Sequence, residues 1–566
     1  MASMLQRHAH PILFVDEIII EFLQHVHQPQ SGIDNTDINA AGLTCKAWRD
    51  PSLAVKWNEV YLIRLLSVLA PLRKSDVEGR PAVWVFARVP TESDHHRFHD
   101  IARRVHFLKD GGHLQLGKSV FATISSSIPE STVLLSNLRS AHFIARRFGP
   151  IFVTTVARLL PFYPLSLRQL ALSIDPSSAE SRETLLRNLA SRFSKLSTVS
   201  FYRGALTHAD VGAMAELLEH NSDLRHVMIQ QSVTSTQVDA LLKLPRLELL
   251  EIGAGRLNEP LDYRRCTREG PFPQLRSLTI QLTLDARVFN LLTNIGAHHS
   301  LQTLKIVSPH KGLEPLDLDA AVDAVVKHPL LRQLSLCHFL VPTSQISVLQ
   351  TIAACTMLEL LEVDILTTSG TLAKSSADTP IADGVVGNLL QHLPRLTELM
   401  LSVVDHQSSE PLFTFRALVV AVAHCPLLKR VTLVIDTRIP VAIAPATHQN
   451  ERPRVLDFSF TVSGLDDSPI DDPEYVADVI AQLRPEVDIR MNMPLHGWYR
   501  WGDVAYILSR AHDVSDKGME SEFGLAGTSL AVLVRRRAYN KTLNKNVFDC
   551  NKTLSPRQSF VTLSKQ

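Results

Sequence analysis

The most regular feature of this chain is a recurring spacing of apolar residues: one, a second three positions later, and a third two positions after that. The clearest copy is Leu331, Leu334 and Leu336. Further copies begin at Leu167, Leu196, Leu224, Leu247, Leu275, Leu301, Leu358, Leu396 and Leu428, and looser copies begin at Leu138 and Val455. The alternating end of each copy has the two-residue period of a strand that buries one face. One such unit cannot bury its own apolar face, so neighbouring units must stack.

The copies recur at a nearly constant distance along the chain. The step is 26 residues from Leu275 to Leu301, 30 from Leu301 to Leu331, and 27 from Leu331 to Leu358. This period, together with the Leu-x-x-Leu-x-Leu signature, is typical of leucine-rich repeats. Helical stretches lie between copies, most clearly at residues 210–220 and 415–424. The sequence therefore predicts an α/β fold, a curved leucine-rich-repeat solenoid with its strands on the concave face.

The N-terminal region has a different pattern, with apolar residues at helical spacing over residues 11–26. A second helix is expected over residues 38–47, and Asp50-Pro51 is expected to end a helix and start another. In the first helix, Ile19 and Leu23 are four residues apart, and so are Ile18 and Phe22 beside them. A small three-helix unit can bury only one such stripe, so part of this apolar surface should remain exposed for a partner.

Three stretches of this region form a recognisable set: DEIIIEFL at 16–23, LTCKAWRDP at 43–51, and Lys56-Trp57. Together they resemble an F-box of the type common in fungal proteins. The family usually has Leu-Pro one turn before its acidic pair, whereas here Pro11 lies earlier and Phe14-Val15 precede Asp16. The alternative is a helical cap on the solenoid in which Trp48 and Trp57 are simple core residues.

The resemblance covers about residues 10–62 and implies a function. It implies the substrate-recognition subunit of a Skp–cullin–F-box ubiquitin ligase, whose partners are a Skp-type adaptor, a cullin and an unknown protein substrate held by the repeats. It implies no enzyme activity and no cofactor. The residues that would bind the adaptor are Pro11, Val15, Ile18, Ile19, Phe22, Leu23, Leu43, Cys45 and Trp48.

The domain boundaries follow from these patterns. We expect an F-box-like domain at 10–62, a connector at 63–100, the solenoid at 101–495, and an irregular C-terminal cap with a basic tail at 496–566. Trp84, Phe86 and Val89 suggest a first strand, and Val105 with Phe107 suggest the first true repeat. Insertions at residues 257–273, 309–319 and 367–380 are predicted surface loops. The two domains are expected to share few contacts.

Composition and charge narrow the possible functions. The chain has 58 Lys and Arg against 57 Asp and Glu, a net charge of +1. This near-neutral charge argues against a protein whose whole surface binds nucleic acid or an acidic membrane. None of the six cysteines forms a Cys-x-x-Cys pair, which favours free thiols in a reducing compartment. The N-terminus does not have the form of a signal peptide, and the apolar runs are too short to span a membrane. The expected location is the cytoplasm or nucleus.

Candidate chemistry is sparse. His95 and His99 stand four apart and could bind a metal on a helix, but a solvated polar loop is the favoured interpretation. Gly253-Ala254-Gly255 lacks the rest of a dinucleotide-binding motif and is predicted to be a turn. Two alternatives to the ligase remain: a protein-binding scaffold that uses the repeats without a ligase, and, with little support, an enzyme in the region after Pro494.

Overall fold

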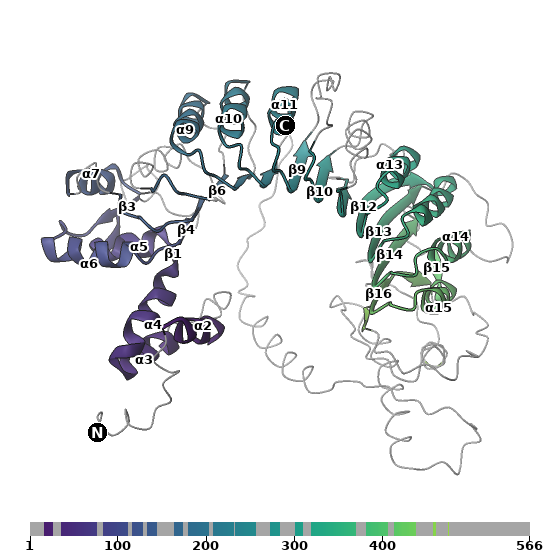
Figure 1. Cartoon of the computed structure of the whole chain (residues 1–566), viewed down its shortest axis with the longest axis horizontal. Coiled ribbons are helices and arrows are strands. Elements are labelled where there is room, and N and C mark those ends of the chain that lie inside the picture. The colour runs from purple at the N-terminus through teal and green to yellow at the C-terminus, as the bar shows by residue number, and fades with distance from the viewer. Residues whose placement is uncertain are drawn as a thin grey trace, which may run out of the picture. The chain divides into compact units, whose positions relative to one another are not determined.

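The structure, a computed structural model, describes only part of the chain. The described residues are 16–26, 36–75, 83–110, 116–127, 133–143, 163–173, 179–202, 208–230, 233–255, 272–282, 300–308, 318–368, 381–405, 412–436, 457–459 and 474. The chain divides into two compact units, Met1–His310 and Lys311–Gln566, and we describe each by itself (Figure 1). Several predictions fall outside the described residues: those made for Pro11, Val15, residues 257–271, 309–317 and 369–380, and the tail at 496–566.

The first described elements of unit 1 are three helices, α2 (Asp16–Val26), α3 (Thr36–Thr44) and α4 (Lys46–Asn58). Ile19 and Leu23 of α2 pack with Ile38 of α3 and Val55 of α4 to form a small apolar core. The predicted helical spacing of α2 is therefore confirmed. Its inward stripe is the one that contains Ile19 and Leu23.

The expected helix break at Asp50-Pro51 is wrong, because α4 runs without interruption through Pro51. Proline lacks the N–H that would bond to the carbonyl of Ala47, so the helix continues with one ladder hydrogen bond fewer. Pro51 and Ser52 are buried, and their packing holds this turn in place. The boundary falls earlier, where Cys45 in extended conformation separates α3 from α4.

The sheet of unit 1 consists of parallel strands whose spatial order is their sequence order. Its described strands are β1 (Glu59–Tyr61), β4 (Phe107–Asp110), β5 (Ser140–Phe143), β6 (Gln169–Ser173), β7 (Thr198–Tyr202), β8 (His226–Ile229), β9 (Leu249–Gly255), β10 (Ser277–Leu282) and β11 (Thr303–Val307). Equivalent repeat positions pair directly, so that Val199 lies opposite Leu170 on one side and Val227 on the other. The three apolar positions of each predicted copy from Leu138 to Ile306 are buried. The in-register rows make this a leucine-rich-repeat solenoid.

The solenoid starts earlier than predicted. Trp57, Val60 and Leu62 have the repeat spacing and are buried, and β1 pairs with β4 from Glu59 onward. The boundary predicted between residues 62 and 63 therefore falls inside the first repeat, where α5 (Leu62–Leu69) follows β1 directly. In the next repeat Leu108 is buried and Phe107 lies on the opposite face, so the predicted register was shifted by one residue.

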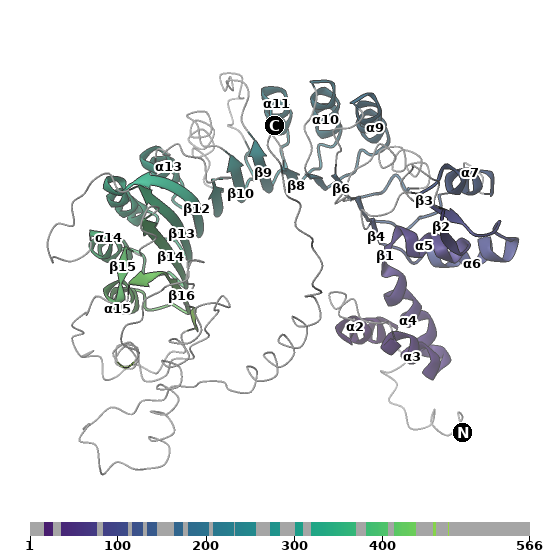
Figure 2. The same ribbon diagram turned by 180° about the vertical axis from the view of Figure 1, so that it is seen from behind.

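Helices form the second layer of unit 1. They are α5 (Leu62–Leu69), α6 (Glu92–Ala102), α7 (Lys118–Ser127), α9 (Ala179–Arg192), α10 (His208–His220) and α11 (Ser235–Leu242). Figures 1 and 2 show α9, α10 and α11 side by side on one face of the sheet. The predicted helix at 210–220 is thus confirmed. Trp84 and Phe86 belong to β3 (Val83–Phe86), which pairs antiparallel with β2 (Leu72–Ser75) outside the repeat sheet.

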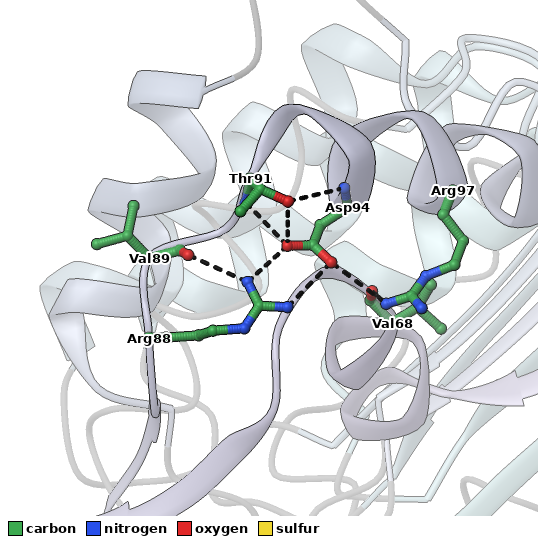
Figure 3. Close-up of polar contacts among 6 residues, drawn as sticks. All are labelled: Val68, Arg88, Val89, Thr91, Asp94 and Arg97. Atoms are coloured by element: carbon green, nitrogen blue, oxygen red, sulfur yellow. Dashed lines mark hydrogen bonds and ion pairs between the residues drawn. The ribbon is translucent and has the colours of Figure 1, made fainter.

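The segment that contains the histidine group is a helix, not the solvated loop that we favoured. Thr91 caps α6 in a reciprocal capping box with Asp94. Arg88 donates to both carboxylate oxygens of Asp94 at 2.6 and 3.0 Å, and Arg97 donates to Asp94 at 3.4 Å and to the carbonyl of Val68 in α5 at 2.8 Å (Figure 3). The Arg88 guanidinium and the Thr91 donors hold the pKa of Asp94 well below its usual range. Asp94 therefore anchors the start of α6 to the turn that precedes it.

The repeats share one type of turn, which connects the helix side of a repeat to its strand. The N–H of the first repeat leucine donates to the carbonyl three residues earlier, as in Leu224 to Asn221 at 3.0 Å and Leu358 to Cys355 at 3.1 Å. The Cys355 and Cys425 thiols are buried, and burial raises their pKa values to about 11 and about 12. Both thiols stay protonated near neutral pH, which agrees with their interpretation as small core residues.

Unit 2 repeats the same plan. Its described strands β12 (Gln333–Pro342), β13 (Leu360–Thr368), β14 (Glu398–Asp405), β16 (Arg430–Leu433) and β18 (Asp457–Ser459) pair in parallel in that order. The covering helices are α13 (Leu318–Val326), the 3-10 helix η5 (Thr343–Ala354), α14 (Ile381–Leu390) and α15 (Phe415–His424), and β15 (Phe413–Thr414) pairs with β17 (Ile435–Asp436). The helix predicted at 415–424 is confirmed, and Leu334, Leu361, Leu399 and Val431 occupy one buried row.

Two further boundaries differ from the predictions. Thr367 is buried inside β13, so the insertion predicted to begin there begins later. Gly253 lies in β9 and not in a turn. A Cβ at Gly253 would stand 2.2 Å from the Cα of Gln230, so only glycine lets β9 come this close to the preceding strand.

Candidate functional site

The first candidate surface is the face of the unit 1 sheet that does not carry the leucine rows. Along this face Lys109, His142, Ala171, Ser200 and Met228 are direct neighbours on successive strands. The row then continues through Glu251, Thr279 and Lys305. Most of these side chains are half-buried and polar. A polar, solvent-facing row across parallel strands is suited to binding an extended partner.

Two titratable groups on this face have altered proton affinity. Burial, with a smaller contribution from Lys109, lowers the pKa of His142. Burial raises the pKa of Glu251, against the opposing effects of Gln230 and Lys305. These shifts favour the neutral form of both groups and reflect desolvation by neighbouring strands.

The corresponding face of unit 2 carries a β-bulge. Between Leu336 and Phe339 two residues of β12 oppose the single residue Asp364 of β13. His338 is the second of the two, and its backbone has a φ of 62°, in the left-handed region that non-glycine residues rarely adopt. Its exposed ring places Nδ1 2.8 Å from Oδ2 of Asp364. Bulges of this kind redirect a side chain, and here one directs an imidazole outward beside a carboxylate.

The strain at His338 gives a testable prediction. His338→Gly and His338→Ala both remove the ion pair, but only alanine keeps the Cβ that makes a positive φ unfavourable. We expect the glycine variant to be more stable than the alanine variant by about 1 kcal/mol, measured from hydrogen exchange of β12 and β13. Equal stability, or greater stability of the alanine variant, would show that the backbone is not held in the left-handed region.

The second candidate surface is an apolar patch on the three-helix unit. Ile18 is 39% exposed and Phe22 is 54% exposed on the outer side of α2. The Phe22 ring packs edge-on against Trp48 of α4, with ring centroids 6.0 Å apart. Leu43, 86% exposed, and Cys45, also exposed, precede Trp48 at the junction of α3 and α4. We call Ile18, Phe22, Leu43, Cys45 and Trp48 the apolar patch.

Two residues that we expected on this surface are not accessible. Ile19 and Leu23 are buried among Ile38 and Val55, so a partner cannot reach their side chains while the unit is folded. The physical reason is the helical period, since each of the two stripes on α2 faces a different side and only one can face solvent. The binding of an adaptor by the other expected residues stays a prediction.

The three-helix unit is attached directly to the repeats. Asn58 ends α4 and its carbonyl accepts from His106 N–H at 3.0 Å, at the entry to β4. Arg104 donates to the Asp50 side chain of α4 at 3.2 Å. Arg64 of α5 lies over the buried Trp57 ring, 5.2 Å from its centroid. Among the described elements, the contacts of the three helices with the repeats are confined to this junction, as the sequence predicted, and Trp57 serves as the first repeat position.

Within the part of the chain that the structure describes, no group of three or more His, Cys, Asp or Glu side chains is placed to hold a metal ion. No helix among these residues is both long enough and apolar enough to span a membrane.

Comparisons with known proteins identify no family for this chain. No protein-family model matches the chain, and no curated protein sequence matches it. Solved structures with a similar course are an internalin from Listeria monocytogenes (10% identity, 66% of this chain and 79% of that one, TM-score 0.33), the mouse RP105/MD-1 complex (14%, 77% and 59%, 0.32) and a TLR13–ssRNA13 complex (13%, 70% and 54%, 0.36). The chain thus spans little more than half of the last two. Scores this low establish no family, and the assignment as a leucine-rich-repeat solenoid rests on the strand registers.

Sequence reasoning missed two features of these surfaces. The first repeat, Trp57, Val60 and Leu62, has the right spacing, but these residues were assigned to the F-box-like domain. A search for the apolar spacing without a requirement for leucine would have found it. The bulge at His338 leaves no comparable signal, because Leu336 and Phe339 are both apolar and the extra residue between them looks like ordinary strand.

Proposed function

We propose that this protein is the substrate-recognition subunit of a Skp–cullin–F-box ubiquitin ligase. In this proposal the apolar patch binds a Skp-type adaptor, the adaptor links the chain to a cullin, and the polar sheet faces hold a protein substrate. The chain performs no bond chemistry of its own. Such a complex would act in the cytoplasm or nucleus.

The observation that supports the proposal best is the contact between the exposed Phe22 and the half-buried Trp48. A phenylalanine and a tryptophan in contact at the surface are costly to leave in water, and clustered aromatic residues often dominate protein interfaces. Ile18 extends the same side of α2 by one turn. The adaptor is the occupant to which we commit, because the patch lies within the F-box-like sequence.

The test is a pull-down of a purified Skp-type adaptor with the full chain. We expect Phe22→Asp to weaken binding by about 30-fold or more, the effect of losing a hot-spot residue worth about 2 kcal/mol. Because Phe22 is exposed, the variant should retain the circular dichroism of the wild type. Ile19→Asp is unsuitable, since it would place a charge in the three-helix core.

A matched control makes the result specific. Leu165→Asp introduces the same charge at an exposed apolar position, 63% exposed, elsewhere in unit 1, and should bind the adaptor as the wild type does. Failure of the wild type to bind would remove the F-box interpretation. Unchanged binding by Phe22→Asp would place the contact elsewhere on the three helices.

A second candidate function is a protein-binding scaffold outside any ligase. The direct continuation of α4 into β1 and the Arg104–Asp50 contact favour it, because they are the contacts expected of a helical cap on a solenoid. Copurification of a cullin with the full chain separates the two functions. A scaffold that uses only its repeats would not retain a cullin.

A further inference from the structure

The edge of the unit 1 sheet where strands β5 to β10 begin carries an unusual charge distribution. We define the basic edge as the residues immediately before and after the first apolar repeat residue of these six strands. Its charged members are six cations and two anions: Arg139, Arg168, Lys195, Arg225, Arg246, Arg276, Asp223 and Glu248. The six positive charges less the two negative ones leave a charge of +4 on a chain whose total is +1.

The two anions are already engaged within the edge. Arg225 lies 3.3 Å from Glu248, and Arg246 lies 2.6 Å from Asp223. The other four cations, Arg139, Arg168, Lys195 and Arg276, are exposed, and none has a carboxylate within ion-pair distance among the described residues. Their charge is therefore available to a partner.

The edge is a continuous line and not a set of scattered charges. The N–H of Arg168 donates to the carbonyl of Arg139 at 2.9 Å, and the N–H of Arg276 donates to the carbonyl of Glu248 at 2.8 Å. The same hydrogen bond links every intervening strand entry. At about 4.8 Å per strand, the five steps from β5 to β10 span about 24 Å, which an extended peptide covers with about seven residues.

We propose that the basic edge binds an extended, acidic segment of the protein substrate. Calling the bound protein a substrate rests on the proposed function. The charge of the basic edge does not depend on that function. Arginine presents a planar fork of donors that matches carboxylate and phosphate oxygens, so aspartate, glutamate and phosphoserine share the required chemistry. Nucleic acid is disfavoured because the whole chain is nearly neutral and the edge positions include no aromatic residue on which bases could stack.

The experiment measures fluorescence anisotropy of labelled twelve-residue peptides with the full chain. The probes are an alternating Glu-Ser peptide, the same length of alternating phosphoserine and Gly, and a neutral Gln-Ser peptide, with oligo-dT as the nucleic-acid probe. We expect both anionic peptides to bind, the neutral peptide not to bind, and affinity to fall with added salt. The tighter of the two anionic peptides identifies the source of the negative charge.

Charge reversal locates the site. Arg139→Glu with Arg168→Glu should weaken binding of the anionic peptides about tenfold or more, because like charges would then face one another. The matched double variant Arg187→Glu with Lys243→Glu makes the same charge change at exposed positions on α9 and at the end of α11, and should bind as the wild type does.

Several outcomes would overturn the proposal. They are no binding of either anionic peptide, equal binding of the neutral peptide, equal loss in both double variants, or tighter binding of oligo-dT that the edge variant abolishes. The adaptor pull-down keeps the two proposals separate. If the wild type binds the anionic peptides but not the adaptor, the basic edge stands and the ligase function fails.

Discussion

Asp210→Ala is expected to lower the free energy of opening of α9 and α10 by about 3–5 kcal/mol, the range for a broken buried ion pair. Asp210 is fully buried, and its Oδ2 lies 2.8 Å from Nη2 of Arg182, which is 2% exposed. Removal of the carboxylate would take away the ion pair of a guanidinium that is buried inside the helix layer. The pair joins two neighbouring repeats, so both helices should lose protection together.

Hydrogen exchange is the suitable measurement, because a solenoid need not unfold in one step. The control is Glu183→Ala, at the position next to Arg182 on α9. It removes the ion-pair partner of Arg187, and because both of these side chains are partly exposed, it should lower the free energy of opening by less than about 1 kcal/mol. Replacement of both Arg182 and Asp210 by leucine should recover most of the loss. A loss below about 1 kcal/mol for Asp210→Ala would mean that water reaches the pair.

Leu334→Ala should cost about 2–5 kcal/mol in unit 2, because it leaves a cavity in the buried leucine row. Leu334 is fully buried in β12 and lies opposite Leu361 of β13. Repeats contact only their neighbours, so the loss should be greatest in β12 and β13 and absent from the three-helix unit of unit 1.

Leu330→Ala is the matched control, since Leu330 lies in the same repeat but is 43% exposed. Its effect on hydrogen exchange of β12 should be within about 0.5 kcal/mol, as is usual for surface substitutions. If the two variants were equally stable, Leu334 would not be a core residue.

The repeat architecture could be predicted because it depends on the spacing of apolar residues along the chain. A row such as Leu170, Val199, Val227 and Leu250 is visible in the sequence as a regular period, and the structure pairs these residues directly. The prediction was less accurate where apolar residues were adjacent. Phe107 and Leu108 both suit a strand interior, and only pairing with β1 and β5 decides that Leu108 faces the helices.

The candidate surfaces were only partly predictable for a related reason. The sequence shows that α2 has too many apolar residues for one buried face, but not which stripe is exposed. Packing against Ile38 and Val55 decides that Ile19 and Leu23 are inside, and contact with Trp48 places Phe22 outside. Likewise the basic edge arises only when strand entries far apart in sequence become neighbours.

The repeat spacing and the helical period of α2 could be predicted because each depends on residue types a few positions apart, and the near-neutral total charge follows from composition. The tertiary structure alone decided the start of the sheet at β1, the buried Arg182–Asp210 pair and the bulge at His338. These features depend on which segments meet, and an arginine or histidine has the same identity in sequence whether it finds a carboxylate partner or remains in water.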